Sequence, residues 1–308
     1  MTKSDKPAIP VSILLFVGIL AISFSSIFVR WSDAPVSIQA MYRLLITAVI
    51  MIPFGWKHRR GISIISIREW MLLAVSGIML AVHFLLWMGS LNWTSVASST
   101  IILAMQPIFV MIGAFILFRE RTRAAALAGM AIAFLGVFLL MGAGIQEGEQ
   151  GTLTGDVMSF LGTLAVAIHM LLGQMLLRKM HAYLYSWFVF VIAAASLAVY
   201  NLLVDIPFTV YSLKEWGIFL LLAVVPTVFG HLLFNWLMTF SNASTISMSV
   251  LGEPVGASLL AFLLLDEAMN VQQFTGGAVV LCGLLLFLRQ QSRARSLSIS
   301  AGDADIQV

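Results

Sequence analysis

The chain has 308 residues, of which 60% are hydrophobic and only 10% are charged, and its formal net charge is +3. A soluble globular protein carries about a quarter charged residues, so this composition excludes a soluble domain and predicts a membrane protein. The few basic residues lie in short clusters between apolar runs, which is typical of topology signals and not of a nucleic-acid surface.

The apolar runs that are long enough to cross a bilayer, which takes roughly 20 residues in a helix, predict ten spans. They are expected at residues 11–29, 36–55, 69–90, 96–117, 124–142, 153–177, 183–204, 215–237, 244–264 and 272–289. We therefore expect an all-α polytopic protein built from two five-helix repeats. Its parts are a cytoplasmic N-terminal segment (1–10), a first repeat (11–142), an extracytoplasmic linker (143–152), a second repeat (153–289) and a disordered cytoplasmic tail (290–308).

The two halves are related by an internal repeat at a constant offset of 147 residues. A proline interrupts one apolar run in each half, preceded by Gln106 in the first copy and by Glu253 in the second. A proline within a helix leaves a carbonyl without its donor, which lipid does not tolerate, so this backbone and its polar neighbour should face the interior. The offset aligns Pro107 with Pro254, Glu120 with Glu267, Gly129 with Gly276, and Gly136 with Gly283.

The positions of lysine and arginine predict the orientation of the chain. With a cytoplasmic N-terminus, every basic residue except Arg30, Arg43 and Lys214 falls on the cytoplasmic side. The positive-inside rule therefore favours an N-in, C-in topology. Because each half has an odd number of spans, the two repeats enter the membrane from opposite sides. Inverted repeats of this kind are typical of transporters that alternate access around a site near the midplane.

These features resemble the drug/metabolite transporter superfamily, and specifically its EamA-type branch. The resemblance rests on the ten spans, the two halves, the P-x12-E pattern at both prolines and the glycines that follow it, and it covers the chain up to about Arg289. It implies a metabolite exporter of the plasma membrane, with a cavity lined by spans one, three, four, six, eight and nine and with spans five and ten as outer support. The family often has glutamate before both prolines, so Gln106 disfavours a mechanism with two symmetric carboxylates.

Glu253 is the main candidate for substrate binding or ion coupling, because a carboxylate near the middle of a span costs about 2.5 to 3.5 kcal/mol on insertion scales. On a continuous helix it shares a face with Ser249, one turn earlier. We favour a proton-coupling or substrate-binding role over a structural carboxyl beside the Pro254 turn. Gln106 holds the equivalent position and is expected to line the same cavity, with helix packing as the alternative.

Arg43 lies about two turns into the second span from its outer end. It is either a clamp for a substrate carboxylate or an intramembrane acid, or a structural residue that holds the first two spans together or anchors at the interface. Glu120 and Glu267 lie at span ends, where a carboxylate caps a helix or pairs with an arginine, so we expect them to be structural.

Aromatic and histidine side chains supply the remaining candidates. His83 and Trp87 share a face of span three, as do His231 and Asn235 on span eight. Each histidine either relays protons or binds a polar substrate group, or else tethers a neighbouring helix. Trp87 and Trp236 offer stacking surfaces for a planar substrate, or they belong to the aromatic belt.

Motifs for other functions are absent from the sequence, which contains no G-x-x-x-x-G-K-[ST], H-E-x-x-H or G-x-S-x-G pattern and one cysteine, Cys282. We therefore expect no enzyme activity, cofactor or metal, and a secondary transporter that exports amino acids or related amphipathic metabolites, with proton coupling as a hypothesis. The alternatives are nucleobase, vitamin or drug-like aromatic cargo, or an uncoupled facilitator. The expected partners are a small-molecule substrate and the lipid bilayer of a bacterial cytoplasmic membrane, without nucleic acid, for a monomer or a homodimer.

Overall fold

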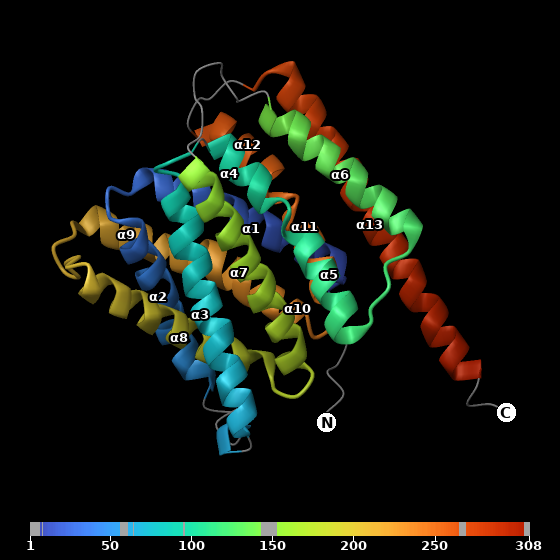
Figure 1. Ribbon diagram of the computed structural model, residues 1–308, viewed down its shortest axis with the longest axis horizontal. Helices are drawn as coiled ribbons and strands as arrows, with labels where there is room; N and C mark the ends of the chain where they lie inside the picture. Colours follow the sequence, from blue (N-terminus) through green and yellow to red (C-terminus); the bar gives the residue numbers. More distant parts are fainter. Residues whose placement is uncertain are drawn as a thin grey trace.

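The computed structural model describes residue 7 and residues 9–55, 61–63, 65–94, 96–142, 153–264 and 269–304 (Figure 1). Across these ranges the regular structure is helical throughout, and ten spans are long and apolar enough to cross a membrane. The all-α class and the ten predicted spans are thereby confirmed. The linker at 143–152 and Glu267 lie outside the described residues.

The first five spans are formed by α1 (Val11–Trp31), α2 (Val36–Gly55), α3 (Ile67–Ser90), α4 (Val96–Leu103) with α5 (Gln106–Phe118), and α6 (Ala124–Gly142). The second five are formed by α7 (Leu153–Leu177), α8 (Ala182–Leu203), α9 (Leu213–Leu222) with η2 (Ala223–Leu232) and α10 (Leu233–Leu237), α11 (Ala243–Val250) with α12 (Glu253–Leu264), and α13 (Val271–Ala304).

The fourth and ninth spans are each broken into two helices at the predicted prolines. A turn at Ala104 and Met105 separates α4 from α5, and a turn at Leu251 and Gly252 separates α11 from α12, at the same place in both repeats. In each case the proline falls in the first turn of the second helix, where its missing N–H group is not needed. The break therefore places the start of α5 and of α12, with Gln106 and Glu253, in the middle of a span.

The eighth span contains a π-helical segment, η2, which the hydrophobic pattern does not predict. Pro226 lies inside it, and the hydroxyl of Thr227 donates to the carbonyl of Leu222 at 2.7 Å. Proline removes one backbone donor, and the wider π turn lets the chain pass this position without ending the span. Segments of this kind occur frequently at functional sites.

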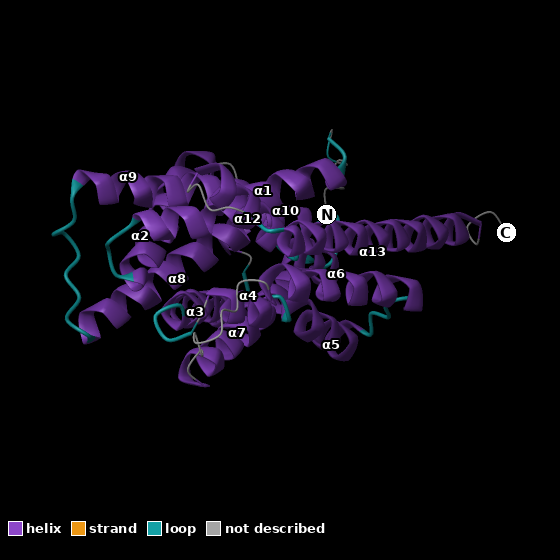
Figure 2. Cartoon of the chain, turned by 90° about the horizontal axis from the view of Figure 1, so that it is seen from above, coloured by secondary structure: helices purple, strands orange, loops and turns teal. Residues whose placement is uncertain are grey.

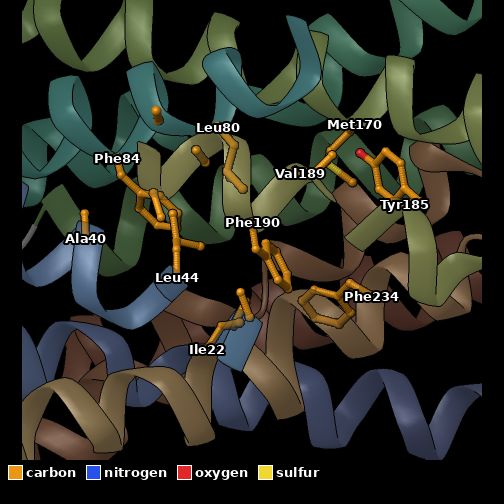
Figure 3. Close-up of a cluster of buried hydrophobic side chains, with 14 of the residues drawn as sticks. Ile22, Ala40, Leu44, Leu80, Phe84, Met170, Tyr185, Val189, Phe190 and Phe234 are labelled. Carbon is orange, nitrogen blue, oxygen red and sulfur yellow. The ribbon is translucent and has the colours of Figure 1, made fainter. Parts of the chain in front are cut away.

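The buried core lies among α1, α2, α3, α7, α8 and the eighth span. In lipid, helices associate through close packing and not through exclusion of water, so interlocking side chains hold these core helices together. Figure 3 shows side chains of several helices turned toward one another in the core, among them Ile22, Leu44, Phe84, Phe190 and Phe234.

Helices α6 and α13 pack along each other at one edge of the molecule (Figures 1 and 2), as expected for outer support. Glycines bring the two backbones together. A Cβ atom on Gly129 would lie 2.7 Å from the amide nitrogen of Phe287, and one on Gly136 would lie 2.9 Å from the carbonyl oxygen of Gly276. These glycines therefore serve helix packing.

We expect Gly136→Leu to destabilise the protein by about 1 to 3 kcal/mol, because the atoms that meet the new side chain include backbone that cannot move aside. The measurement is thermal unfolding of the purified protein in detergent. Gly217→Leu is the matched control, since a Cβ there meets no atom within 4 Å. Equal unfolding temperatures for the two variants would contradict the packing role.

Helix α13 continues to Ala304 and projects beyond the other helices (Figure 2). The sequence predicts a disordered tail from residue 290, so the structure differs from that expectation as far as Ala304, and residues 305–308 lie outside the described part. Residues 290–304 contain Gln, Arg, Leu and Ala, which favour helix. They extend a helix that is already formed, so no new nucleation is needed.

Candidate functional site

A cavity of about 800 Å³ lies between the two repeats, and we call it the wide cavity. Its lining comes from the end of α1, the start of α2, the end of α3, both broken spans and the facing ends of α6 and α13. The mouth is therefore on the side of the bundle at which α1 ends. The volume falls within the range of roughly 300 to 1,000 Å³ that is usual for small-molecule sites.

A second cavity of about 70 Å³, the deep cavity, shares Trp87, Gln106 and Glu253 with the wide one. All but two of the predicted site residues line it, and they come from both repeats. They are Arg43 of α2, His83 and Trp87 of α3, Gln106 of α5, His231 of η2, Asn235 of α10 and Glu253 of α12. Spans one, three, four, six, eight and nine contribute as expected, and the second span contributes in addition through Arg43.

Arg43 is only 1% exposed and joins three helices. Its Nε donates to the hydroxyl of Thr227 at 3.0 Å, and its Nη1 donates to the hydroxyl of Ser25 at 3.2 Å. The guanidinium carbon also lies 4.5 Å from the centroid of the Phe84 ring. Its Nη2 has no hydrogen-bond partner among the described residues. Arg43 thus holds α1, α2 and η2 together and still keeps one cationic donor beside the cavity.

Glu253 and Gln106 begin the second helix of their broken spans, so a carboxylate and an amide occupy equivalent places. The half-buried Glu253 side chain lines both cavities, and its charge interacts with that of Arg43. Its position in the first turn of α12 also suits a negative group, because the helix dipole is positive there. The Nε2 of Gln106 instead contacts the sulfur of Met170 at 2.7 Å.

The two histidines predicted from the sequence, His83 and His231, also contact neighbouring helices. The Nδ1 of His83 lies 3.0 Å from the carbonyl oxygen of Gly162 in α7, and its ring stacks on Trp87 at an angle of 5°. His231 packs edge-on against Phe84. The Nδ2 of Asn235 donates to the hydroxyl of Ser186 in α8 at 3.2 Å. These side chains therefore combine a place in the cavity wall with a tethering role.

Trp236 and Ser249 do not line either cavity. Trp236 packs edge-on against Phe240 with ring centroids 4.9 Å apart, and the Ser249 hydroxyl donates to the carbonyl of Thr245 at 2.9 Å. Ser249 would share a face with Glu253 only on a continuous helix, and the break before Glu253 changes the direction of the chain. Trp236 follows Asn235 by one residue and so points about 100° away on the helix.

The structure adds cavity residues that the sequence interpretation does not single out, notably Gln39 and His169. Gln39 is four residues before Arg43 and therefore lies on the same face of α2. That spacing is the signal that could have identified it. His169 lies on α7, with its Nδ1 3.0 Å from the Ser76 hydroxyl, and it has no polar neighbour in sequence to mark it.

At the end of the bundle opposite the mouth, Glu120 connects three helix ends. Its carboxylate accepts hydrogen bonds from Gln174 at 2.6 Å, Asn242 at 2.9 Å and Arg178 at 3.4 Å. Gln174 in turn accepts from the amide of Ala243 at 2.5 Å. Glu120 follows α5 in the first repeat, whereas its partners belong to the ends of α7 and α11 in the second. The expected pairing of Glu120 with an arginine is confirmed.

Comparison with known protein families shows to which family the chain belongs. The family model described as the EamA-like transporter family matches residues 9–142 and again residues 153–289. The chain belongs to this family. The two matches fall on the two five-helix halves, so each half of this EamA-like transporter is one copy of the family unit.

Relatives of this EamA-like transporter carry transporter names. An "Uncharacterized transporter" of Archaeoglobus fulgidus is 29% identical over 210 residues, which are 68% of this chain and 73% of the relative. "Uncharacterized transporter YetK" of Bacillus subtilis is 26% identical and covers 82% of this chain and 78% of its own length. A "Probable amino-acid metabolite efflux pump" of Escherichia coli is 28% identical, over 61% of this chain and 66% of its own length.

A solved crystal structure superposes on this EamA-like transporter with a TM-score of 0.76. The match covers 92% of this chain and 98% of that chain, at 17% sequence identity. At this identity the likeness shows the fold alone. It extends over both repeats, so the ten-span arrangement is shared by the two proteins.

Proposed function

We propose that this chain is a secondary transporter that exports small metabolites, with amino acids or related amphipathic compounds as the leading class, by alternating access. The observation that carries the proposal is the convergence of polar residues from both repeats on the deep cavity, which shares wall residues with the wide cavity that opens at one end. Arg43 and Glu253 give the cavity one group of each charge, which suits a zwitterion. The printed name of the Escherichia coli relative agrees with this class.

Proton exchange at Glu253 is the proposed source of energy, with His83 and His231 assisting. A carboxylate inside a span costs free energy of insertion, so its presence there points to a function. Glu253 lines both cavities. In an alternating-access cycle it would bind a proton on one side of the membrane and release it on the other. The proposal includes the N-in, C-in orientation in a bacterial cytoplasmic membrane.

We expect Glu253→Gln to remove the effect of a pH gradient on transport. The measurement is uptake by proteoliposomes of labelled amino acids and planar heterocycles, with and without the gradient. The wild type should show saturable uptake that the gradient accelerates, and the variant should lose that acceleration because its amide does not exchange protons.

Glu69→Gln is the matched control, because Glu69 caps the start of α3 and lies outside both cavities. It should respond to the gradient like the wild type. Unchanged acceleration in Glu253→Gln would make the carboxyl structural.

A planar aromatic cargo is the second candidate, and one observation favours it. Trp87 and His83 stack nearly parallel in the wall of the deep cavity, with ring centroids 5.8 Å apart. A nucleobase, vitamin or drug-like compound could extend this stack. Saturable uptake of the heterocycles and not of the amino acids in the same assay would select this cargo.

A further inference from the structure

Unpaired polar atoms are concentrated around the cavity. Of the described residues, four have a buried side-chain nitrogen or oxygen atom without a hydrogen-bond partner: Gln39 Oε1, Arg43 Nη2, Trp87 Nε1 and Asn201 Oδ1. The first three line the wide or the deep cavity. Buried polar groups are nearly always paired, and an unpaired one calls for an explanation. A bound ligand that supplies the missing partners would provide it.

The three residues that carry these atoms line the cavities from the interior toward the mouth. Arg43 lines only the deep cavity, Trp87 lines both, and Gln39 lines only the wide cavity. Gln39 and Arg43 are one helical turn apart on the same face of α2, a rise of about 6 Å. The residues with an unpaired donor, Arg43 and Trp87, therefore line the deep cavity together with Glu253, and Gln39, with the unpaired acceptor, lines the wide cavity nearer the mouth.

Gln39 holds its acceptor in a fixed place. Its side chain is 2% exposed, and its Nε2 donates to the carbonyl of Ala34 at 2.8 Å. This bond also decides which atom is the oxygen, since the reverse orientation would set two acceptors against each other. Oε1 therefore remains an acceptor that cannot turn to another partner without losing the bond to Ala34.

We propose that Gln39 is a specificity-determining residue that selects amino acids whose side chains donate a hydrogen bond. The proposal rests on the proposed function and deepens it. The ligand carboxylate is held by Arg43 Nη2 and Trp87 Nε1, and its ammonium group faces Glu253. Its side chain then extends toward the mouth, where a hydroxyl or N–H group donates to Gln39 Oε1.

The preference follows from the hydrogen bond that only a ligand with a donor gives to Oε1, which is buried and unpaired without it. A site built around a polar atom discriminates against a ligand of the same shape that cannot pair with it. Threonine and valine are such a pair, since they differ by one hydroxyl in place of one methyl. We expect a preference for threonine of about tenfold, as one modest hydrogen bond predicts.

The test measures kcat/KM for uptake of labelled threonine and of labelled valine by proteoliposomes that contain the full chain. Gln39→Met keeps the length of the side chain and removes the acceptor together with the bond to Ala34, so the ratio should fall to near one while valine uptake persists. Persistent valine uptake also reports that the variant is folded. Asn201→Leu is the matched control, because it removes an unpaired amide oxygen that lies outside both cavities, and it should keep the wild-type ratio.

A wild-type ratio near one overturns the inference whether or not the variant folds. So does a preference for threonine that survives in Gln39→Met. In both cases amino acids are still transported, and the proposed function stands. Absence of saturable uptake of both amino acids by the wild type overturns the inference and the amino-acid cargo together.

Discussion

Arg43→Met is expected to abolish transport, with a loss of at least about a hundredfold in the uptake rate. The substitution removes two hydrogen bonds from a charged donor, to Thr227 and Ser25, together with the contact to Phe84. Hydrogen bonds to charged groups are worth about 1.5 to 3 kcal/mol each, and tenfold in rate corresponds to about 1.4 kcal/mol. The change also removes the positive charge that interacts with the Glu253 carboxylate.

Arg43→Lys separates charge from geometry. A lysine keeps the positive charge but cannot donate in two fixed directions and at the same time lie flat on an aromatic ring. We therefore expect it to remain at least tenfold below the wild type in uptake. Arg68→Met, at the exposed start of α3, is the control and should transport normally. Wild-type uptake by Arg43→Lys would show that a point charge suffices at this place.

The same variants should separate binding from stability. Arg43 joins α1, α2 and η2, so Arg43→Met should also lower the thermal unfolding temperature in detergent. Arg43→Lys, which is similar in length, should recover part of that stability while uptake stays low. If the two Arg43 variants lose uptake in proportion to their loss of stability, the role of Arg43 is structural only.

The sequence predicts the cavity because two independent signals, the helix breaks at the prolines and the polar residues inside the spans, fall at the same positions. Pro107 and Pro254 require a break in the helix, and the constant offset places both breaks at the same point of each repeat. Polar residues inside a span must face protein or water, and this rule assigns Glu253 and Gln106 to the interior of the bundle, whereas it leaves Arg43 open between the interior and the membrane interface.

The remaining differences from the sequence-based expectation arise where one element depends on another. The placement of Ser249 depends on the direction of the chain after the break at Leu251 and Gly252, which helical periodicity does not supply. The π-helical segment at Pro226 packs against helices that are distant in the sequence, and local hydrophobic periodicity carries no information about those contacts. Its spacing from Arg43 places Gln39 on the same face of α2, but only the structure shows that its oxygen is unpaired and that the residue lines a cavity.

Glu120→Ala is expected to open the bundle at the end opposite the mouth. The Glu120 carboxylate connects the end of α5 with the ends of α7 and α11, and so links the two repeats where the wide cavity has no lining residues. Alternating access requires this end to separate. Without the carboxylate, two hydrogen bonds and the ion pair to Arg178 are lost, which should shift the balance by at least about tenfold.

Cysteine labelling measures this opening without knowledge of the cargo. The single native cysteine is replaced by Cys282→Ser, and Val250→Cys places a thiol in the wall that both cavities share. A membrane-impermeant maleimide should label it from the side where α1 ends in the wild-type background. After Glu120→Ala, labelling from the side where α1 begins should rise about tenfold.

Glu69→Ala is the matched control for Glu120→Ala. Glu69 lies at the same end of the bundle, where it caps α3 and pairs with Lys179 at 3.8 Å, but its described hydrogen bonds and ion pair include no residue of α5 or α11. Removing its carboxylate changes the local charge to the same extent and ends its ion pair with Lys179, but it leaves the connection that Glu120 makes between α5, α7 and α11 in place. Equal labelling in the two variants would show that charge at this surface, and not the connection made by Glu120, sets access to the cavity.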